Sequence, residues 1–69
     1  MKLPERMKEL RKERKLRQED IAAALDLSLS AYSRYELGKR EPPASVLENI
    51  ADYYNVSVDY LLGRRNSRK

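Results

Sequence analysis

Apolar side chains recur along this chain at intervals of three and four residues, which is the spacing of one face of an α-helix. In the first block the stripe consists of Leu3, Met7 and Leu10, and later blocks repeat the spacing. The chain shows little of the alternation of apolar and polar residues that is typical of a half-buried strand. The sequence therefore predicts five helices, over residues 4–15, 18–25, 29–37, 44–55 and 59–62.

The breaks between these helices carry residues that start or stop helices. Pro4 suits a first helical turn, because its missing N–H costs nothing there. Asp26 tolerates the left-handed backbone of a tight turn, and Ser28 is a good N-cap for the helix that follows. Gly38 and Gly63 are stop signals after the third and fifth helices. Five short helices predict an all-α fold, a compact five-helix bundle around one small core.

The length of 69 residues is enough for one domain, whose core would supply about 3–5 kcal/mol of net stability. The chain has no Cys and no His, which removes disulfides and the ordinary ligands of a structural zinc site. We therefore expect no metal and no cofactor, and a fold that depends on packing, helped by a dimer interface.

Membrane insertion and export find no support in the sequence. No apolar run approaches the roughly 20 residues of a membrane span. Charged residues occupy positions 1–10, where a signal peptide would have its apolar stretch. We expect a soluble, cytoplasmic protein.

Charge is distributed unevenly along the chain. Residues 1–17 hold eight Lys or Arg against three Glu, and residues 63–69 hold four Lys or Arg. Residues 41–62 hold four Asp or Glu and no Lys or Arg. A basic balance of this kind attracts nucleic acid or anionic membranes, although a solvated helical surface explains the charge equally well.

Catalysis is not expected. There is no His to act as a general base, no Cys to act as a nucleophile, and no glycine-rich loop to hold a phosphate. A domain of this size also offers no deep cleft beside its core. We therefore expect neither an enzyme nor a small-molecule substrate.

The most informative segment is 17–40, RQEDIAAALDLSLSAYSRYELGKR. It predicts a short helix, a tight turn and a second short helix whose outer face is small and polar, followed by a basic loop. Two helices at a steep angle with such a face are suited to reading the major groove of double-stranded DNA.

The residues at fixed positions in this segment form a longer pattern, made of Gln18, Ile21, Ala22, Leu25, Leu27, Ser28, Tyr32, Ser33, Arg34, Glu36, Gly38, Arg40 and Pro42. This pattern resembles the helix-turn-helix of the phage repressor/Cro family, often called Xre-type. Residues 47–62, LENIADYYNVSVDYLL, resemble the closing helices of that family. The resemblance implies a lambda-repressor-like DNA-binding domain over residues 1–63. The basic tail that follows, residues 64–69, should be disordered in isolation.

The resemblance also implies roles for individual residues. The base-reading positions of the family fall on Leu29, Ser30, Ser33 and Arg34. Its phosphate-contacting positions fall on Gln18, Ser28, Lys39 and Arg40. A largely buried salt bridge of the family corresponds to Arg11 and Glu36.

Among the base readers, Arg34 can donate two hydrogen bonds to guanine, with a phosphate contact or a solvated side chain as the alternative. Leu29 stands where relatives often have a polar reader, and its chemistry suits a thymine methyl group. Tyr32 stands where relatives usually have Ile or Val, so its larger ring needs small neighbours.

The sequence therefore predicts a transcriptional regulator, more specifically a repressor, that binds a pseudo-palindromic operator as a homodimer. Tyr53, Tyr60 and Leu61 are a candidate dimer patch, with plain core packing as the alternative. The same fold could instead serve as a protein-interaction module, such as an antitoxin or adaptor, that uses residues 41–62. A basic membrane-surface peptide ranks last, because the basic residues are spread over separate helices.

Overall fold

The computed structural model of the chain describes residues 2–69 and contains five helices in that range. These are α1 (Leu3–Glu13), α2 (Gln18–Ala24), α3 (Leu29–Glu36), α4 (Ala44–Tyr54) and α5 (Val58–Leu61). No strand occurs among the described residues, so the predicted all-α fold with five helices is confirmed. No helix in this range is both long and apolar enough to cross a membrane.

The helix ends follow the capping chemistry of the sequence. The hydroxyl of Ser28 accepts a hydrogen bond from the backbone N–H of Ala31 at 3.1 Å, which caps α3. Ser57 caps α5 in the same way, accepting from the N–H of Tyr60 at 3.0 Å. Asp26 has the positive φ, 58°, that the turn between α2 and α3 requires. Local hydrogen bonding therefore determines where these two helices begin.

The end of α1 differs from the prediction. The helix stops at Glu13, because Lys15 takes a left-handed conformation with φ 57°. This conformation lets the N–H of Leu16 donate to the carbonyl of Arg11 at 3.0 Å, which closes the last turn. Lysine carries no turn signal, so the prediction from apolar spacing continued the helix to residue 15.

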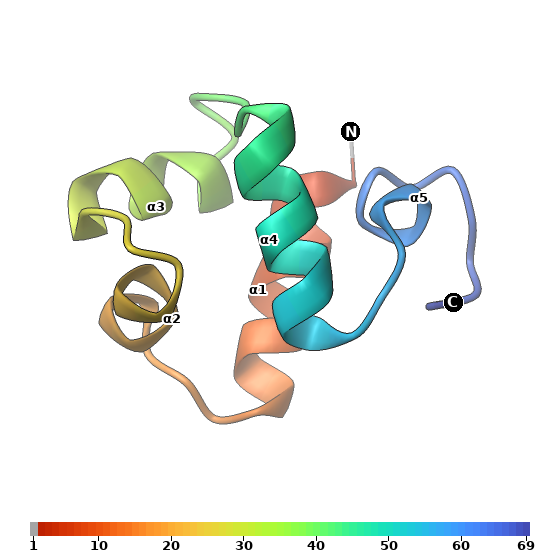
Figure 1. Cartoon of the computed structure of the whole chain (residues 1–69), viewed down its shortest axis with the longest axis horizontal. Helices are drawn as coiled ribbons and strands as arrows, with labels where there is room; N and C mark the ends of the chain where they lie inside the picture. Colours follow the sequence, from red (N-terminus) through yellow and green to blue (C-terminus); the bar gives the residue numbers. More distant parts are fainter. Residues whose placement is uncertain (1) are drawn as a thin grey trace.

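The five helices are arranged along the longest axis of the molecule (Figure 1). Helices α1 and α4 occupy the middle, and the α2–α3 pair lies at one end of that axis. Helix α5 and the segment that follows it lie at the other end. The helix-turn-helix is thus supported from one side only and presents its other side to solvent.

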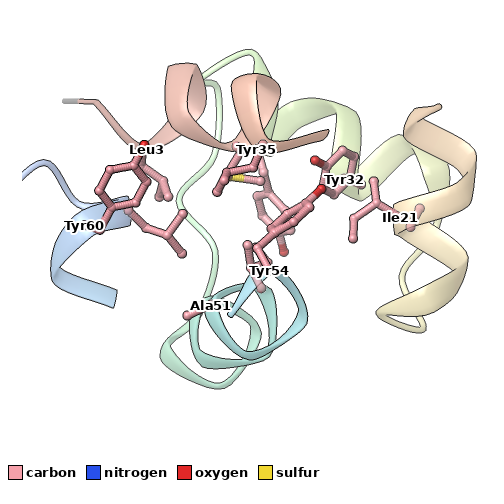
Figure 2. Close-up of a cluster of buried hydrophobic side chains, with 12 residues drawn as sticks. Leu3, Ile21, Tyr32, Tyr35, Ala51, Tyr54 and Tyr60 are labelled. Atoms are coloured by element: carbon pink, nitrogen blue, oxygen red, sulfur yellow. The ribbon is translucent and has the colours of Figure 1, made fainter. Parts of the chain in front are cut away.

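One hydrophobic core joins all five helices (Figure 2). Its buried members are Leu3, Met7, Leu10, Ile21, Ala22, Tyr32, Tyr35, Ile50, Ala51, Tyr54, Tyr60 and Leu61. Tyr54 reaches from α4 towards Tyr32 of α3, so two aromatic rings fill the centre. The ring of Tyr32 is fully buried, and the small side chain of Ala22 on α2 is buried in the same core. The hydroxyls of Tyr32 and Tyr54 are buried without a hydrogen-bond partner among the described residues.

The segment 64–69 lies against α1 and α5. Arg68 forms a two-pronged ion pair with Glu13, with one contact at 2.9 Å, and its carbonyl accepts from the N–H of Ser57 at 2.7 Å. Arg6 donates to the carbonyl of Arg65 at 2.6 Å. The predicted disorder concerned this segment in isolation and stays a prediction; within the folded chain these contacts hold it.

Candidate nucleic-acid interface

The turn between α2 and α3 is built from short backbone hydrogen bonds. The N–H of Leu27 donates to the carbonyl of Ala22 at 2.8 Å, and the N–H of Asp26 donates to Ala23 at 3.1 Å. Ile21 and Ala22 of α2 are buried, and the partly buried Leu27 packs against the same core. The turn is therefore anchored at both ends, and α3 has a fixed direction relative to α2.

Helix α3 has two chemically different faces. Tyr32 and Tyr35 are buried in the core, whereas Leu29, Ser30 and Arg34 point to solvent. The side chain of Leu29 is 50% exposed. Ser33 is half-buried at the edge of this outer face. The four residues expected to read bases thus share the exposed side of one helix.

The basic residues next to α3 are free of partners within the described chain. Arg34, Lys39 and Arg40 are exposed and take part in no side-chain hydrogen bond or ion pair among residues 2–69. Other arginines are engaged by the protein itself: Arg6, Arg11, Arg14, Arg17 and Arg68. Three uncommitted cations therefore accompany α3. Elsewhere among the described residues, the side chains of Lys2, Lys8, Lys12, Lys15 and Arg64 are exposed and likewise unpartnered.

Ser28 has spare hydrogen-bonding capacity. Its hydroxyl oxygen accepts from Ala31 as the N-cap of α3, and this leaves the hydroxyl hydrogen available as a donor. The side chain is exposed at the start of the helix, where backbone N–H groups also point outward. An anion at this position would meet donors from both.

Arg11 and Glu36 form a nearly buried ion pair between α1 and α3. Arg11 Nε lies 2.7 Å from Glu36 Oε2, and Arg11 Nη2 lies 3.2 Å from Oε1. The two side chains are 13% and 1% exposed. Arg11 also donates to the carbonyl of Leu16 at 2.8 Å, which ties the loop before α2 to the pair. The bridge therefore joins α1, the loop and the reading helix.

The charge of Glu36 affects the groups around it. Burial raises the pKa of Glu36. The hydrogen bonds that its carboxylate accepts, chiefly from Arg11 and also from Gln18, outweigh burial and hold the pKa below the ordinary 4.5. Burial, together with the nearby carboxylate, raises the pKa of Tyr54 to about 12 and that of Tyr32 further. Both phenols therefore stay neutral while Glu36 stays ionised at neutral pH.

Gln18 makes a contact that the sequence did not reveal. Its amide nitrogen donates to Glu36 Oε1 at 3.2 Å, and the side chain is half-buried. The two residues lie 18 positions apart on different helices. No local pattern signals a contact of this range, so sequence reasoning identified Gln18 only as a phosphate contact.

The helix-turn-helix family model matches residues 7–61. That span covers helices α2 to α5 completely and α1 from Met7 onward. The chain belongs to the helix-turn-helix family. The resemblance seen in the sequence is thereby confirmed, and family membership also confirms that this helix-turn-helix domain is not an enzyme.

Three relatives show how the domain is used elsewhere. The uncharacterized HTH-type transcriptional regulator YqaE of Bacillus subtilis is 43% identical over 94% of this chain and 56% of its own length. The cryptic phage CTXphi transcriptional repressor RstR of Vibrio cholerae is 38% identical over 93% of this chain and 57% of its own. The HTH-type transcriptional activator BcrR of Enterococcus faecalis is 36% identical over 90% of this chain and 30% of its own.

The chain spans about half the length of YqaE and RstR, so those proteins contain further sequence beyond the shared helix-turn-helix domain. No solved structure matches the chain significantly. Among residues 2–69, no three His, Cys, Asp or Glu side chains are grouped closely enough to hold a metal ion.

The expected dimer patch needs a correction. Tyr60 is 5% exposed and Leu61 is fully buried, so their side chains belong to the core of the helix-turn-helix domain. The guanidinium of Arg6 covers the Tyr60 ring at 4.1 Å, which removes it further from any partner. Only Tyr53, at 36% exposure, remains at the surface. Because Tyr60 is buried, it also cannot be part of the surface that residues 41–62 would offer as a protein-interaction module.

Leu37 is an exposed apolar residue that sequence reasoning overlooked. It caps the C-terminal end of α3 and is 62% exposed. Its position three residues after Arg34 places it on the same side of the helix, and this helical spacing was the signal available in the sequence. The outer face of the helix-turn-helix domain therefore carries a leucine near each end of α3.

Proposed function

We propose that this domain binds double-stranded DNA in a sequence-specific manner, with α3 inserted into the major groove. The observation that carries the proposal is the exposed outer face of α3, on which the unpartnered Arg34 stands. In the proposed complex, Arg34 donates both guanidinium arms to O6 and N7 of a guanine. Leu29 contacts a thymine methyl group, and Ser30 and Ser33 bond base edges within reach.

Phosphate contacts hold α3 in register in this proposal. Ser28 donates its free hydroxyl hydrogen, and Gln18 offers an amide N–H at the start of α2. Lys39 and Arg40 lie along the backbone after α3. Such contacts supply affinity and orientation without sequence information, so they complement the readout by Arg34.

The proposed binding unit is a homodimer on a pseudo-palindromic operator. One domain measures 28 × 23 × 18 Å, so its reading helix covers only part of one helical turn of DNA. Two domains related by a twofold axis would read half-sites about 34 Å apart. The sum of two modest interfaces would then give the specificity that one short helix cannot.

The proposed biological outcome is repression of transcription in the cytoplasm, by occupation of a promoter. RstR is named a repressor, which supports this outcome, and BcrR is named an activator, which shows that relatives of this domain act in either direction. Residues 1–63 would form the DNA-binding unit, and residues 64–69 its basic tail.

Selection of bound sequences from a random pool of double-stranded DNA tests the proposal. The wild-type chain should enrich a sequence with twofold symmetry that contains a guanine in each half-site. Arg34→Ala should bind this site about 5- to 150-fold more weakly, the equivalent of about 1–3 kcal/mol, and lose its preference at that guanine. Enrichment of the same motif by Arg34→Ala, with the guanine intact, would remove Arg34 as the base reader.

A matched control comes from the far end of the molecule. Arg64 is exposed in the segment that follows α5, and this segment lies at the end of the long axis opposite α3 (Figure 1). Arg64→Ala makes the same chemical change in a residue outside the proposed interface and should retain the guanine preference. A pool without any enriched sequence would contradict sequence-specific binding as a whole.

A further inference from the structure

The carboxylate of Glu36 connects the core of the domain to its DNA-facing surface. Glu36 is 4% exposed, yet its Oε1 accepts hydrogen bonds from two sides: Arg11 Nη2 and Gln18 Nε2, each at 3.2 Å. Oε2 accepts from Arg11 Nε at 2.7 Å. Gln18 is thus the outermost member of a chain of polar contacts that starts inside the protein.

The chemistry of this contact determines which end of the Gln18 amide faces inward. An ionised carboxylate only accepts hydrogen bonds, so the amide must present its nitrogen to Glu36. That nitrogen carries two hydrogens, of which Glu36 uses one. The second N–H remains a donor, and a phosphate oxygen needs a donor. Glu36 therefore holds Gln18 in an orientation that keeps one N–H available for an anion.

The charge of Glu36 does not oppose this role. An unpaired carboxylate close to DNA would repel the phosphates, but Arg11 neutralises it with two hydrogen bonds. Arg11 is itself held by the carbonyl of Leu16 at 2.8 Å. The pair as a whole is neutral and rigid, so it provides a fixed support for a surface side chain.

We infer that Glu36 is a positioning residue for DNA binding, which acts by ordering the side-chain amide of Gln18. The inference rests on the proposed function, because it assumes that Gln18 contacts a phosphate. Fixing a flexible side chain before binding improves affinity, since the complex no longer has to restrict it. For one glutamine side chain the gain corresponds to about 3- to 10-fold in Kd.

The wild-type domain allows a direct test by NMR. Gln18 is the only glutamine in the chain, so its side-chain NH₂ signal is easily assigned. Asn49 is exposed on α4 and serves as a reference for a free amide. The order parameter of the Gln18 amide should approach about 0.85, the value of a rigid backbone, while Asn49 stays below about 0.6. Equal mobility of the two amides would overturn the inference.

A double-mutant cycle separates positioning from mere structural support. The variants are Gln18→Met, Glu36→Gln and the double substitution, with Kd measured on the selected DNA site at a temperature where circular dichroism shows all of them folded. Glu36→Gln should weaken binding about 3- to 10-fold in the wild-type background and have almost no effect beside Gln18→Met. Equal losses in both backgrounds would mean that Glu36 acts only through the fold, which overturns the inference.

Two further controls distinguish the possible failures. Glu48→Gln makes the same carboxylate-to-amide change at an exposed position on α4 and should leave Kd unchanged. If Gln18→Met alone leaves Kd unchanged, Gln18 contacts no phosphate and the inference fails. The proposed function would still stand in that case, provided that Arg34→Ala loses the guanine preference.

Discussion

Replacing Glu36 with alanine is expected to remove most of the folding free energy of this domain. The substitution strands Arg11, whose side chain is 13% exposed and retains only its bond to the carbonyl of Leu16. Breaking a buried ion pair from one side costs about 3–5 kcal/mol, and the partial exposure of Arg11 favours the lower end. A domain of this size has a net stability of about 3–5 kcal/mol. A loss of about 3 kcal/mol should lower Tm by roughly 12–24 °C.

Thermal unfolding followed by circular dichroism measures this loss, and Glu13→Ala is the matched control. Glu13 also pairs with an arginine, Arg68, but the two side chains are 44% and 42% exposed. Surface ion pairs contribute little, so Glu13→Ala should leave Tm nearly unchanged. A double change, Arg11→Met with Glu36→Leu, removes both charges and should recover much of the lost stability. If Glu36→Ala and Glu13→Ala melt together, the pair is not buried in solution.

The same reasoning sets the pH dependence. The pKa of Glu36 in the folded state lies below its ordinary value of 4.5. Its contribution to stability is therefore fully present above pH 4.5 and is lost as the pH falls through the folded-state pKa. The difference in urea midpoint between wild type and Glu36→Ala should be constant from pH 7 down to about 5 and shrink below that. A difference that grows on acidification would contradict the sign.

Three further outcomes are expected. Arg40→Ala should weaken binding to all DNA sequences alike and reduce the slope of log K against log salt by about 0.9, as titrations at several salt concentrations would show; an unchanged slope excludes a phosphate contact. Leu29→Ala should bind the selected site about fourfold more weakly, the equivalent of about 0.8 kcal/mol, and lose sensitivity to replacement of thymine by uracil. Tyr54→Phe removes a buried hydroxyl without a partner and should raise Tm by a few degrees, whereas a lower Tm would reveal a partner in solution.

Local chemistry explains why much of the fold could be predicted. Apolar spacing located all five helices, and Ser28 and Ser57 cap the helices that follow them. The positive φ of Asp26 was likewise foreseeable, because aspartate tolerates that conformation. The positive φ of Lys15 was not, since lysine has no side-chain chemistry that favours this conformation.

The candidate site was predictable where it follows helical periodicity and unpredictable where it depends on tertiary contacts. Spacing alone places Arg34 on the side of α3 opposite Tyr32 and Tyr35. The hydrogen bond between Gln18 and Glu36 joins the side chains of two helices, and no local sequence pattern in either helix predicts it. The burial of Tyr60 likewise depends on the meeting of α1 with α5, which no local pattern encodes.

The contacts of residues 64–69 have a consequence for the order of folding. Arg6 donates to the carbonyl of Arg65 across 59 positions, and Arg68 pairs with Glu13 across 55. Such contacts close a loop that contains nearly the whole chain, so they cannot form before α1 and α5 are docked. Because they are made at the surface, they also open at little cost. This closure should therefore be the last step of folding and the first to reverse, while the helix-turn-helix at the other end of the molecule stays intact.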